Sequence, residues 1–195
     1  MLENSRVFVL LPGYFNKGNM KRYIETPRLI LRGWREEDVA PFARINSDEQ
    51  VMEYFLKKLD EEETRAFYRR IVDEFADCGW GLYAVEDKAD RSFIGYVGFH
   101  RIGFEVDFAP GIEIGWRLRK ESWGKGLATE AAAACLEYGR DVLGLKEVYS
   151  FTSLLNKRSE RVMQKIGMSF AGEFGHPLVD PAHVLYKHVL YKKLL

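Results

Sequence analysis

The chain has 195 residues, enough for one domain with a sizeable core, and its 29 basic and 29 acidic residues cancel. This balance gives no reason to expect nucleic acid or an anionic membrane as the main partner, and no apolar run reaches the ~20 residues of a membrane-spanning helix. The two cysteines, Cys78 and Cys135, form neither a disulfide framework nor a zinc-ligand spacing, so they indicate a reducing compartment, the cytoplasm.

Residues 1–19 do not share the regular pattern of the chain that follows. Their run "VFVLLPGYF" is apolar, but Glu3 precedes it and no small-residue cleavage site follows, which argues against a signal peptide. We treat residues 1–19 as an extension of unknown role, either an added arm or the result of a start upstream of Met20, and residues 20–195 as a single domain.

Hydrophobic periodicity and turn residues predict the helices and strands of residues 20–195. The predicted elements, in order, are a strand (28–34), two helices (35–46 and 60–75), three strands (80–87, 92–102 and 111–118), a helix (127–142), a strand (146–152), a helix (156–167) and one or two last strands (183–195). Three strands in succession favour antiparallel pairing, and the later strand–helix–strand unit favours one parallel crossover. We therefore predict a mixed α/β fold, with a mostly antiparallel central sheet and helices on both faces.

The stretch "ESWGKGLATEAAAA" places two glycines around Lys125, immediately before an alanine-rich helix. Because glycine inside a helix costs about 1 kcal/mol relative to alanine, Gly124 and Gly126 are expected to precede the helix and to leave backbone N–H groups unpaired. Such groups, together with the helix dipole, bind anions such as phosphate. A Walker P-loop is excluded because Arg119 and Gly126 occupy its glycine and Ser/Thr positions, and Thr129 replaces the third glycine of a dinucleotide fingerprint. A turn that binds nothing is the alternative.

Three segments of the chain resemble the GNAT superfamily of N-acetyltransferases, in the same order. The turn "WGKGLA" (123–128) is similar to the family's pyrophosphate loop, Gln/Arg-x-x-Gly-x-Gly/Ala, with Trp123 in place of the usual Gln or Arg. The segments "IETPRLILRGWREEDV" and "NKRSERVMQKIGM" are similar to the first strand and helix, and to a late helix, of the branch that contains the ribosomal-protein N-terminal (alanine) acetyltransferases. The resemblance covers residues 20 to about 170 and implies the same fold.

The resemblance also implies acetyl-coenzyme A as a co-substrate, without a metal. The loop amides would bind its pyrophosphate, and the strand before the loop would pair with its pantetheine arm and supply an amide to the thioester oxygen. Asn156 and Ser159 would contact the arm from the opposite side. The implied cofactor-binding residues are Trp116, Arg117, Leu118, Trp123, Gly124, Lys125, Gly126, Leu127, Ala128, Thr129, Asn156 and Ser159.

Glu113 is the candidate for the general base, because an attacking amine is largely protonated near neutral pH and must lose a proton. Period-two alternation places it on the same face of its strand as Gly115 and Arg117. In the resembling branch a glutamate in the "EIGW"-like segment faces the substrate. The alternative is a structural glutamate paired with Arg117 or Arg101.

Ser159 is the candidate acid for the leaving thiolate, because Met163 stands where many members of the superfamily have a tyrosine. The alternatives are a water molecule, departure without a proton, or a helix-start serine that bonds the local backbone. His100 either faces the acceptor pocket or is a partly exposed polar residue, and Cys135 is expected in the core. Four aromatic residues are candidates for the acceptor pocket, although core packing is the expected role of most of them: Trp34, Tyr54, Phe104 and Phe108.

The sequence therefore predicts an N-acetyltransferase that moves the acetyl group of acetyl-coenzyme A directly to a primary amine in a ternary complex. The resemblance implies a protein N-terminal α-amine or a small amine as the acceptor, and we expect a monomer or a homodimer. Two alternatives stay open: a non-catalytic module that keeps acyl-coenzyme A as a regulatory ligand, and a transferase for longer acyl chains.

Overall fold

The computed structural model describes residues 21–195, so the predicted extension at residues 1–19 lies outside the described residues. Within them, eight strands form one sheet in the order β1-β2-β3-β4-β5-β6-β8-β7. Neighbouring strands are antiparallel except for β5 and β6, which are parallel and are connected through α3. The predicted mostly antiparallel sheet with one parallel crossover is confirmed.

The predicted elements are all present apart from their exact ends, and the structure adds two further strands, β1 and β7. The strands are β1 (Arg22–Glu25), β2 (Leu29–Arg32), β3 (Leu82–Asp87), β4 (Phe93–Arg101), β5 (Ile112–Leu118), β6 (Glu147–Ser153), β7 (Ser169–Gly175) and β8 (Lys187–Leu194). The helices are α1 (Val39–Ser47), α2 (Glu61–Cys78), α3 (Leu127–Asp141) and α4 (Lys157–Lys165), with short 3₁₀ turns at Glu36–Asp38 and Lys120–Ser122. None of the helices in the part of the chain described is both long and apolar enough to cross a bilayer.

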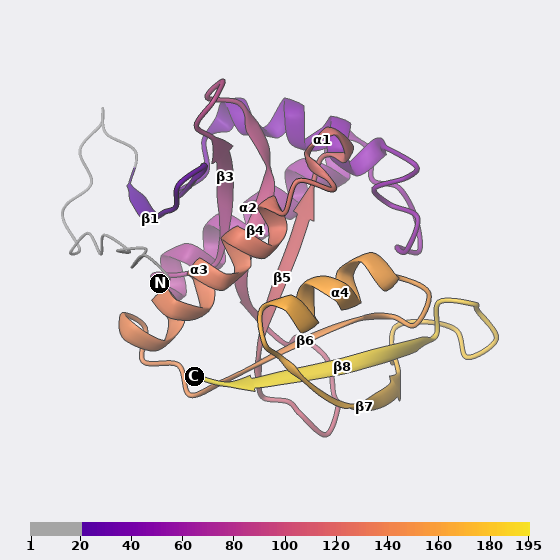
Figure 1. Cartoon of the computed structure of the whole chain (residues 1–195). Helices are drawn as coiled ribbons and strands as arrows, with labels where there is room; N and C mark the ends of the chain where they lie inside the picture. Colours follow the sequence, from indigo (N-terminus) through magenta and orange to yellow (C-terminus); the bar gives the residue numbers. More distant parts are fainter. Residues whose placement is uncertain (1–20) are drawn as a thin grey trace.

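The helices cover both faces of the sheet, as predicted (Figure 1). In this view α3 and α4 lie in front of the sheet, and α1 and α2 lie behind it. Successive side chains of β3 point to opposite faces of the sheet. Tyr83 and Val85 join the core that includes α3, whereas Leu82 and Ala84 join the core beneath α1 and α2. Each face of the sheet therefore has its own hydrophobic core.

The sheet opens between β5 and β6. The two strands share a single pair, Glu113 opposite Tyr149, whereas β4 and β5 pair along their whole length. Figure 1 shows β6, β7 and β8 running at a steep angle to β3, β4 and β5. From Trp116 to Leu118, the edge of β5 that faces away from β4 is left without a neighbouring strand.

The sequence analysis did not predict two of the strands, β1 and β7. β1 precedes the predicted first strand and pairs with β2 as a short hairpin. β7 lies at the edge of the sheet, and most of its side chains are exposed, so it carries no apolar alternation that a sequence pattern could detect. It also lies outside residues 183–195, where the sequence predicted one or two last strands and where the structure has β8.

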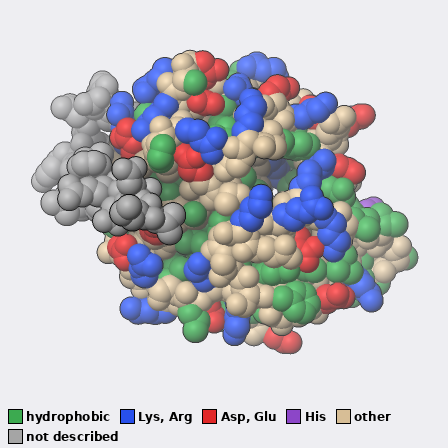
Figure 2. Space-filling view, in the orientation of Figure 1, with side chains coloured by type: hydrophobic (Ala, Val, Ile, Leu, Met, Phe, Trp, Pro, Cys, Tyr) green, Lys and Arg blue, Asp and Glu red, His purple; other side chains and the backbone are tan. Residues whose placement is uncertain are grey.

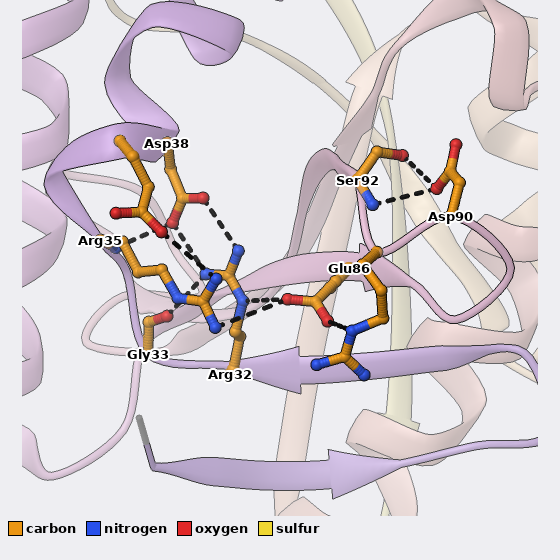
Figure 3. Close-up of polar contacts among 9 residues, drawn as sticks. Arg32, Gly33, Arg35, Asp38, Glu86, Asp90 and Ser92 are labelled. Atoms are coloured by element: carbon orange, nitrogen blue, oxygen red, sulfur yellow. Dashed lines mark hydrogen bonds and ion pairs between the residues drawn. The ribbon is translucent and has the colours of Figure 1, made fainter. Parts of the chain in front are cut away.

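A buried ion cluster joins β2, β3 and the start of α1 (Figure 3). The guanidinium of Arg32 donates two hydrogen bonds to Asp38, at 2.8 and 2.9 Å, and one to Glu86, at 2.9 Å. The carboxylate of Glu86 also lies 2.8 Å from Arg91 and 3.7 Å from Arg35. Buried charges are tolerated when they are paired and hydrogen-bonded, so this cluster fixes the entry into α1 against the sheet.

Candidate active site

A cavity of about 1170 Å³ lies along the open edge of β5, between α4 and the segment that joins α1 to α2. Figure 2 shows this face of the molecule, with a hollow beside Lys and Arg side chains gathered in the region of α4. Every predicted site residue except Lys125 lines the cavity: Glu113, Trp116, Arg117, Leu118, Trp123, Gly124, Gly126, Leu127, Ala128, Thr129, Asn156 and Ser159. The structure therefore brings the predicted cofactor and catalytic residues together around one space.

The glycine turn presents a row of free backbone donors at the start of α3. Gly124 and Gly126 have φ angles of 73° and 77°, a left-handed conformation that glycine adopts readily. The N–H groups of residues 124–129 have no hydrogen-bond partner among the described residues. A Cβ on Gly124 would meet no atom of these residues within 4 Å, so the space in front of the turn is open. Free N–H groups at the positive end of a helix suit an anion.

Arg28 and Glu130 hold this turn from its other side. Arg28 donates to the carbonyl of Lys125 at 2.8 Å and pairs with Glu130 at 2.6 Å. Glu130 also accepts a hydrogen bond from the Thr26 hydroxyl at 2.6 Å. Burial acts to raise the pKa of Glu130, but the hydrogen bonds from Thr26 and Arg28 outweigh it and hold this pKa below its usual value. The hydrogen bond from Arg28 keeps the Lys125 carbonyl turned towards this side of the turn. Sequence reasoning missed this support, because Arg28 and Glu130 are 102 positions apart.

Trp123, which replaces the family's usual Gln or Arg, is fixed between a strand and a helix. Its indole N–H donates to the Leu118 carbonyl at 2.9 Å, and the Arg158 guanidinium lies 4.4 Å from its ring centroid. Arg161 and Lys165 of α4 line the same cavity. These cations lie on α4 and add positive charge to the cavity that the turn also lines.

Asn156 and Ser159 form the start of α4. The side-chain oxygen Oδ1 of Asn156 accepts from the Ser159 backbone N–H at 3.2 Å, which confirms the predicted helix cap. Its amide nitrogen donates to Thr152 at 3.0 Å and to the Ser159 hydroxyl oxygen at 3.2 Å. The Ser159 hydroxyl therefore accepts from a side chain and keeps its own proton available to the cavity. Met163, one turn further along, is buried in the core.

Glu113 pairs with His100, not with Arg117 or Arg101 as the structural alternative expected. Its Oε2 lies 2.9 Å from Nε2 of His100, on the neighbouring strand. Desolvation acts to lower the pKa of His100, but the charge and the hydrogen bond of Glu113 outweigh it and raise this pKa to about 9. The imidazole is therefore cationic at neutral pH, and His100 takes part in the site as an ion-pair partner.

The second oxygen of Glu113 faces open space above Gly115. A Cβ on Gly115 would lie 3.7 Å from Glu113 Oε1 and would meet no other atom of the described residues within 4 Å. Glu113 and Arg117 lie on the α1–α2 face of β5, whereas Ile114 and Trp116 pack into the core of the other face. The predicted alternation along β5 is thus confirmed.

Aromatic side chains and two histidines line the far end of the cavity. Phe104 and Phe151 pack against each other at 5.7 Å between ring centroids, and Phe104 lies 4.6 Å from the His176 ring. Burial, with the nearby His188, lowers the pKa of His176 to about 4, so this ring is neutral near pH 7. Among the predicted pocket aromatics, Phe104 and Tyr54 line the cavity.

The remaining candidates lie in packed regions. Trp34 belongs to the core beneath α1 and α2, and Phe108 packs on Tyr149 and Phe174. Cys135 is fully buried and burial raises the pKa of its thiol, so it is a core residue as expected. Across residues 21–195, no three His, Cys, Asp or Glu side chains are arranged to hold a metal ion.

Comparison with known proteins identifies the family that this fold and site define. A family model described as "Acetyltransferase (GNAT) domain" matches residues 28–169, and the chain therefore belongs to the GNAT acetyltransferase family. It is 31% identical over 154 residues to the uncharacterized protein YkkB of Bacillus subtilis, covering 78% of this chain and 88% of YkkB. The crystal structure of a GNAT-family acetyltransferase from Bacillus anthracis aligns with a TM-score of 0.71 at 26% identity, over 90% of this chain and 97% of that one.

Two further solved structures share the fold and have named activities. A ribosomal-protein-S5-alanine acetyltransferase from Vibrio fischeri aligns with a TM-score of 0.70 at 19% identity, over 87% of this chain and 94% of that one. A spermidine N-acetyltransferase from Vibrio cholerae, solved with CoA and spermine, aligns with a TM-score of 0.66 at 20% identity, over 85% of this chain and 95% of that one. At these identities the likeness concerns the fold alone, and the acceptor stays undefined.

Proposed function

We propose that this acetyltransferase uses acetyl-coenzyme A to acetylate a primary amine by direct attack in a ternary complex. The observation that carries the proposal is a single cavity. It combines the free N–H groups of residues 124–129, the open edge of β5 and the Glu113–His100 pair. The first two suit a diphosphate and an amide-bearing arm, and the third suits a proton acceptor.

The residues around the turn fit the coenzyme. The amides of residues 124–129 would hold the diphosphate, assisted by Arg158, Arg161 and Lys165. The N–H of Arg119 donates to the Ile94 carbonyl of β4, so alternation turns the backbone groups of Trp116 and Leu118 towards the cavity. The Leu118 carbonyl is occupied by the Trp123 indole, which leaves the two N–H groups and the Trp116 carbonyl for the pantetheine arm.

Glu113 is proposed to take the proton of the attacking amine. Its Oε2 is held by cationic His100, so Oε1, above Gly115, is the atom that receives the proton, directly or through one water molecule. When bound, acetyl-coenzyme A supplies a thioester whose carbon–sulfur bond breaks as the amine nitrogen bonds to the acetyl carbon. Ser159, whose hydroxyl proton is free, is proposed to donate to the departing sulfur.

Replacement of Glu113 tests the catalytic assignment. Glu113→Gln keeps the size of the side chain but removes its basicity, so we expect coenzyme A to bind as in the parent while turnover falls about 10²–10⁴-fold. Glu173→Gln, at an exposed position on β7, is the matched control and should leave both unchanged. Binding is followed by calorimetry, and turnover by thiol release with a panel of amines and peptides.

The same experiment separates the rival functions. Full turnover by Glu113→Gln would show that another group takes the proton. A parent protein that binds coenzyme A but acetylates nothing in a broad amine and peptide screen would instead support the regulatory module. Competition among acetyl-, propionyl- and longer acyl-coenzyme A decides whether acetyl is the preferred group.

A further inference from the structure

Arg117 is a buried cation without a counter-ion. Its side chain lies on the α1–α2 face of β5, and the residue is 7% exposed. The guanidinium makes one hydrogen bond, from Nη1 to the Asn46 amide oxygen at 2.6 Å. Nε is buried without a partner, and neither Nε nor Nη2 bonds to any side chain or carbonyl of residues 21–195. Arg32, which is also buried, has two carboxylate partners, Asp38 and Glu86. Of these two buried arginines, only Arg117 is left without a counter-ion among the described residues.

The free side of this guanidinium has the geometry of a carboxylate site. Nε and Nη2 together form the side-on fork of arginine, whose N–H groups match the oxygens of a carboxylate. Nε is enclosed, so Nη2 is the donor of the fork that a ligand in the cavity can reach. The plane of the group is fixed by the Phe55 and Tyr96 rings, 4.1 and 5.6 Å from Cζ to the ring centroids, and by Asn46. Asn46 is itself fully buried and donates to Thr64 at 3.1 Å. The fork is thus held ready beside the cavity that Arg117 lines.

The fork and the proposed base lie at two ends of one trough. Glu113 and Arg117 are four positions apart on β5, about 13 Å between Cα atoms, and Gly115 leaves open floor between them. On β4 the opposite residues are His100 and Tyr96. One end of the trough therefore accepts a proton, and the other end carries an unpaired positive charge.

We propose that the acceptor is an amine that also carries a carboxylate, with the carboxylate bound by Arg117 through Nη2 and the amine placed above Gly115. This rests on the proposed amine acetylation and names its substrate class. A polyamine would bring a second cation towards Arg117, where no acidic side chain offsets it within hydrogen-bonding reach. An uncharged amine would leave the buried guanidinium without an anion.

Matched acceptors test the substrate class. Linear ω-amino acids, diamines and monoamines of equal chain length are compared by kcat/KM with acetyl-coenzyme A, and an aminoalkyl phosphonate series is run beside them. We expect the amino acids of the best length to exceed the diamines and monoamines at least tenfold. Preference for diamines, or for monoamines, overturns the proposal, and preference for phosphonates over carboxylates replaces the proposed anion.

Arg117→Met and Arg117→Lys test the residue itself. Both variants should raise KM for the amino acids about 10–100-fold, because methionine removes the charge and lysine keeps the charge but loses the fork. KM for monoamines, which carry no group for Arg117, should change little. The family resemblance implied a cofactor-binding role for Arg117, but its backbone groups face β4 and its side chain lies on the α1–α2 face. Coenzyme A affinity should therefore stay within threefold of the parent in calorimetry. A comparable loss of coenzyme A affinity would place a cofactor phosphate on Arg117 and refute the proposal.

A binding measurement keeps this inference separate from the proposed reaction. An alkanoate of the same length as the best amino acid has no amine to acetylate, so it can occupy the fork without turnover. It should raise the melting temperature of the parent but not of Arg117→Met, in the presence of coenzyme A. If the parent acetylates nothing and yet shows this shift, amine acetylation fails while the carboxylate site stands. If neither protein responds, the carboxylate site fails.

Discussion

Alanine at Gly124 should weaken coenzyme binding far more than it weakens the fold. Gly124 and Gly144 have φ angles of 73° and 68°, and a Cβ at either would meet no described atom within 4 Å. Alanine in this left-handed conformation costs about 1–2 kcal/mol, so both variants should melt a few degrees lower by about the same amount. Gly144 lies outside the cavity, in the turn after α3, and serves as a strain-matched control.

Only the methyl group of Gly124→Ala projects into the proposed phosphate site. If the methyl group moves the phosphate out of reach of one or two N–H groups, each charge-assisted hydrogen bond that is lost costs about 1.5–3 kcal/mol. The dissociation constant for coenzyme A should therefore rise about 10–100-fold, and the constant of Gly144→Ala should stay near that of the parent. Calorimetry measures both, and thermal unfolding without ligand measures the strain. Equal affinities in all three proteins, or an equal loss in both variants, would refute the anion site at the turn.

Two further predictions concern stability. Arg32→Met removes the partner of two buried carboxylates, Asp38 and Glu86, and should cost about 3–5 kcal/mol in urea unfolding at pH 7; a loss below about 1 kcal/mol would contradict the role given to the cluster. His176 has a folded pKa of about 4, below its ordinary 6.5, so unfolding takes up a proton between these values and the parent should lose stability as the pH falls through that window. His176→Phe should lose less stability over the same pH range. If the melting temperature falls equally in both proteins between pH 7 and pH 4.5, protonation of His176 is not the cause.

The glycine turn and the cap of α4 could be predicted from the sequence because their determinants are local. Glycines around Lys125 mark a turn that ordinary residues would strain, and the alanine-rich run after it marks a helix. Asn156 and Ser159 are three positions apart at the start of another helix, so the cap follows from one turn of chain. Their contact with the coenzyme stays a prediction. The family model, which spans residues 28–169, is consistent with this reading.

The partners of these residues could not be predicted, because they come from other strands. His100 meets Glu113 only through the register between β4 and β5, and a shift of one residue would turn each side chain to the opposite face. The structural alternative named Arg117 or Arg101 as the partner of Glu113, because arginine pairs readily with carboxylates. That no carboxylate of residues 21–195 pairs with Arg117 is a property of the whole neighbourhood, including the α1–α2 segment, which no spacing along β5 could reveal.

The arrangement of β5 explains how one strand can serve two substrates independently. Towards the opening, backbone groups of Trp116 and Leu118 face the proposed coenzyme arm, and their side chains belong to the α3 face. Glu113 and Arg117 alternate with them and point to the α1–α2 face, where the acceptor is proposed to bind. Substitutions at Glu113 and Arg117 can therefore change the acceptor while the backbone edge that is proposed to bind the coenzyme is kept. The fold is shared by acetyltransferases with different named acceptors, so the charge pattern at Glu113 and Arg117 is a better guide to the proposed acceptor than the fold.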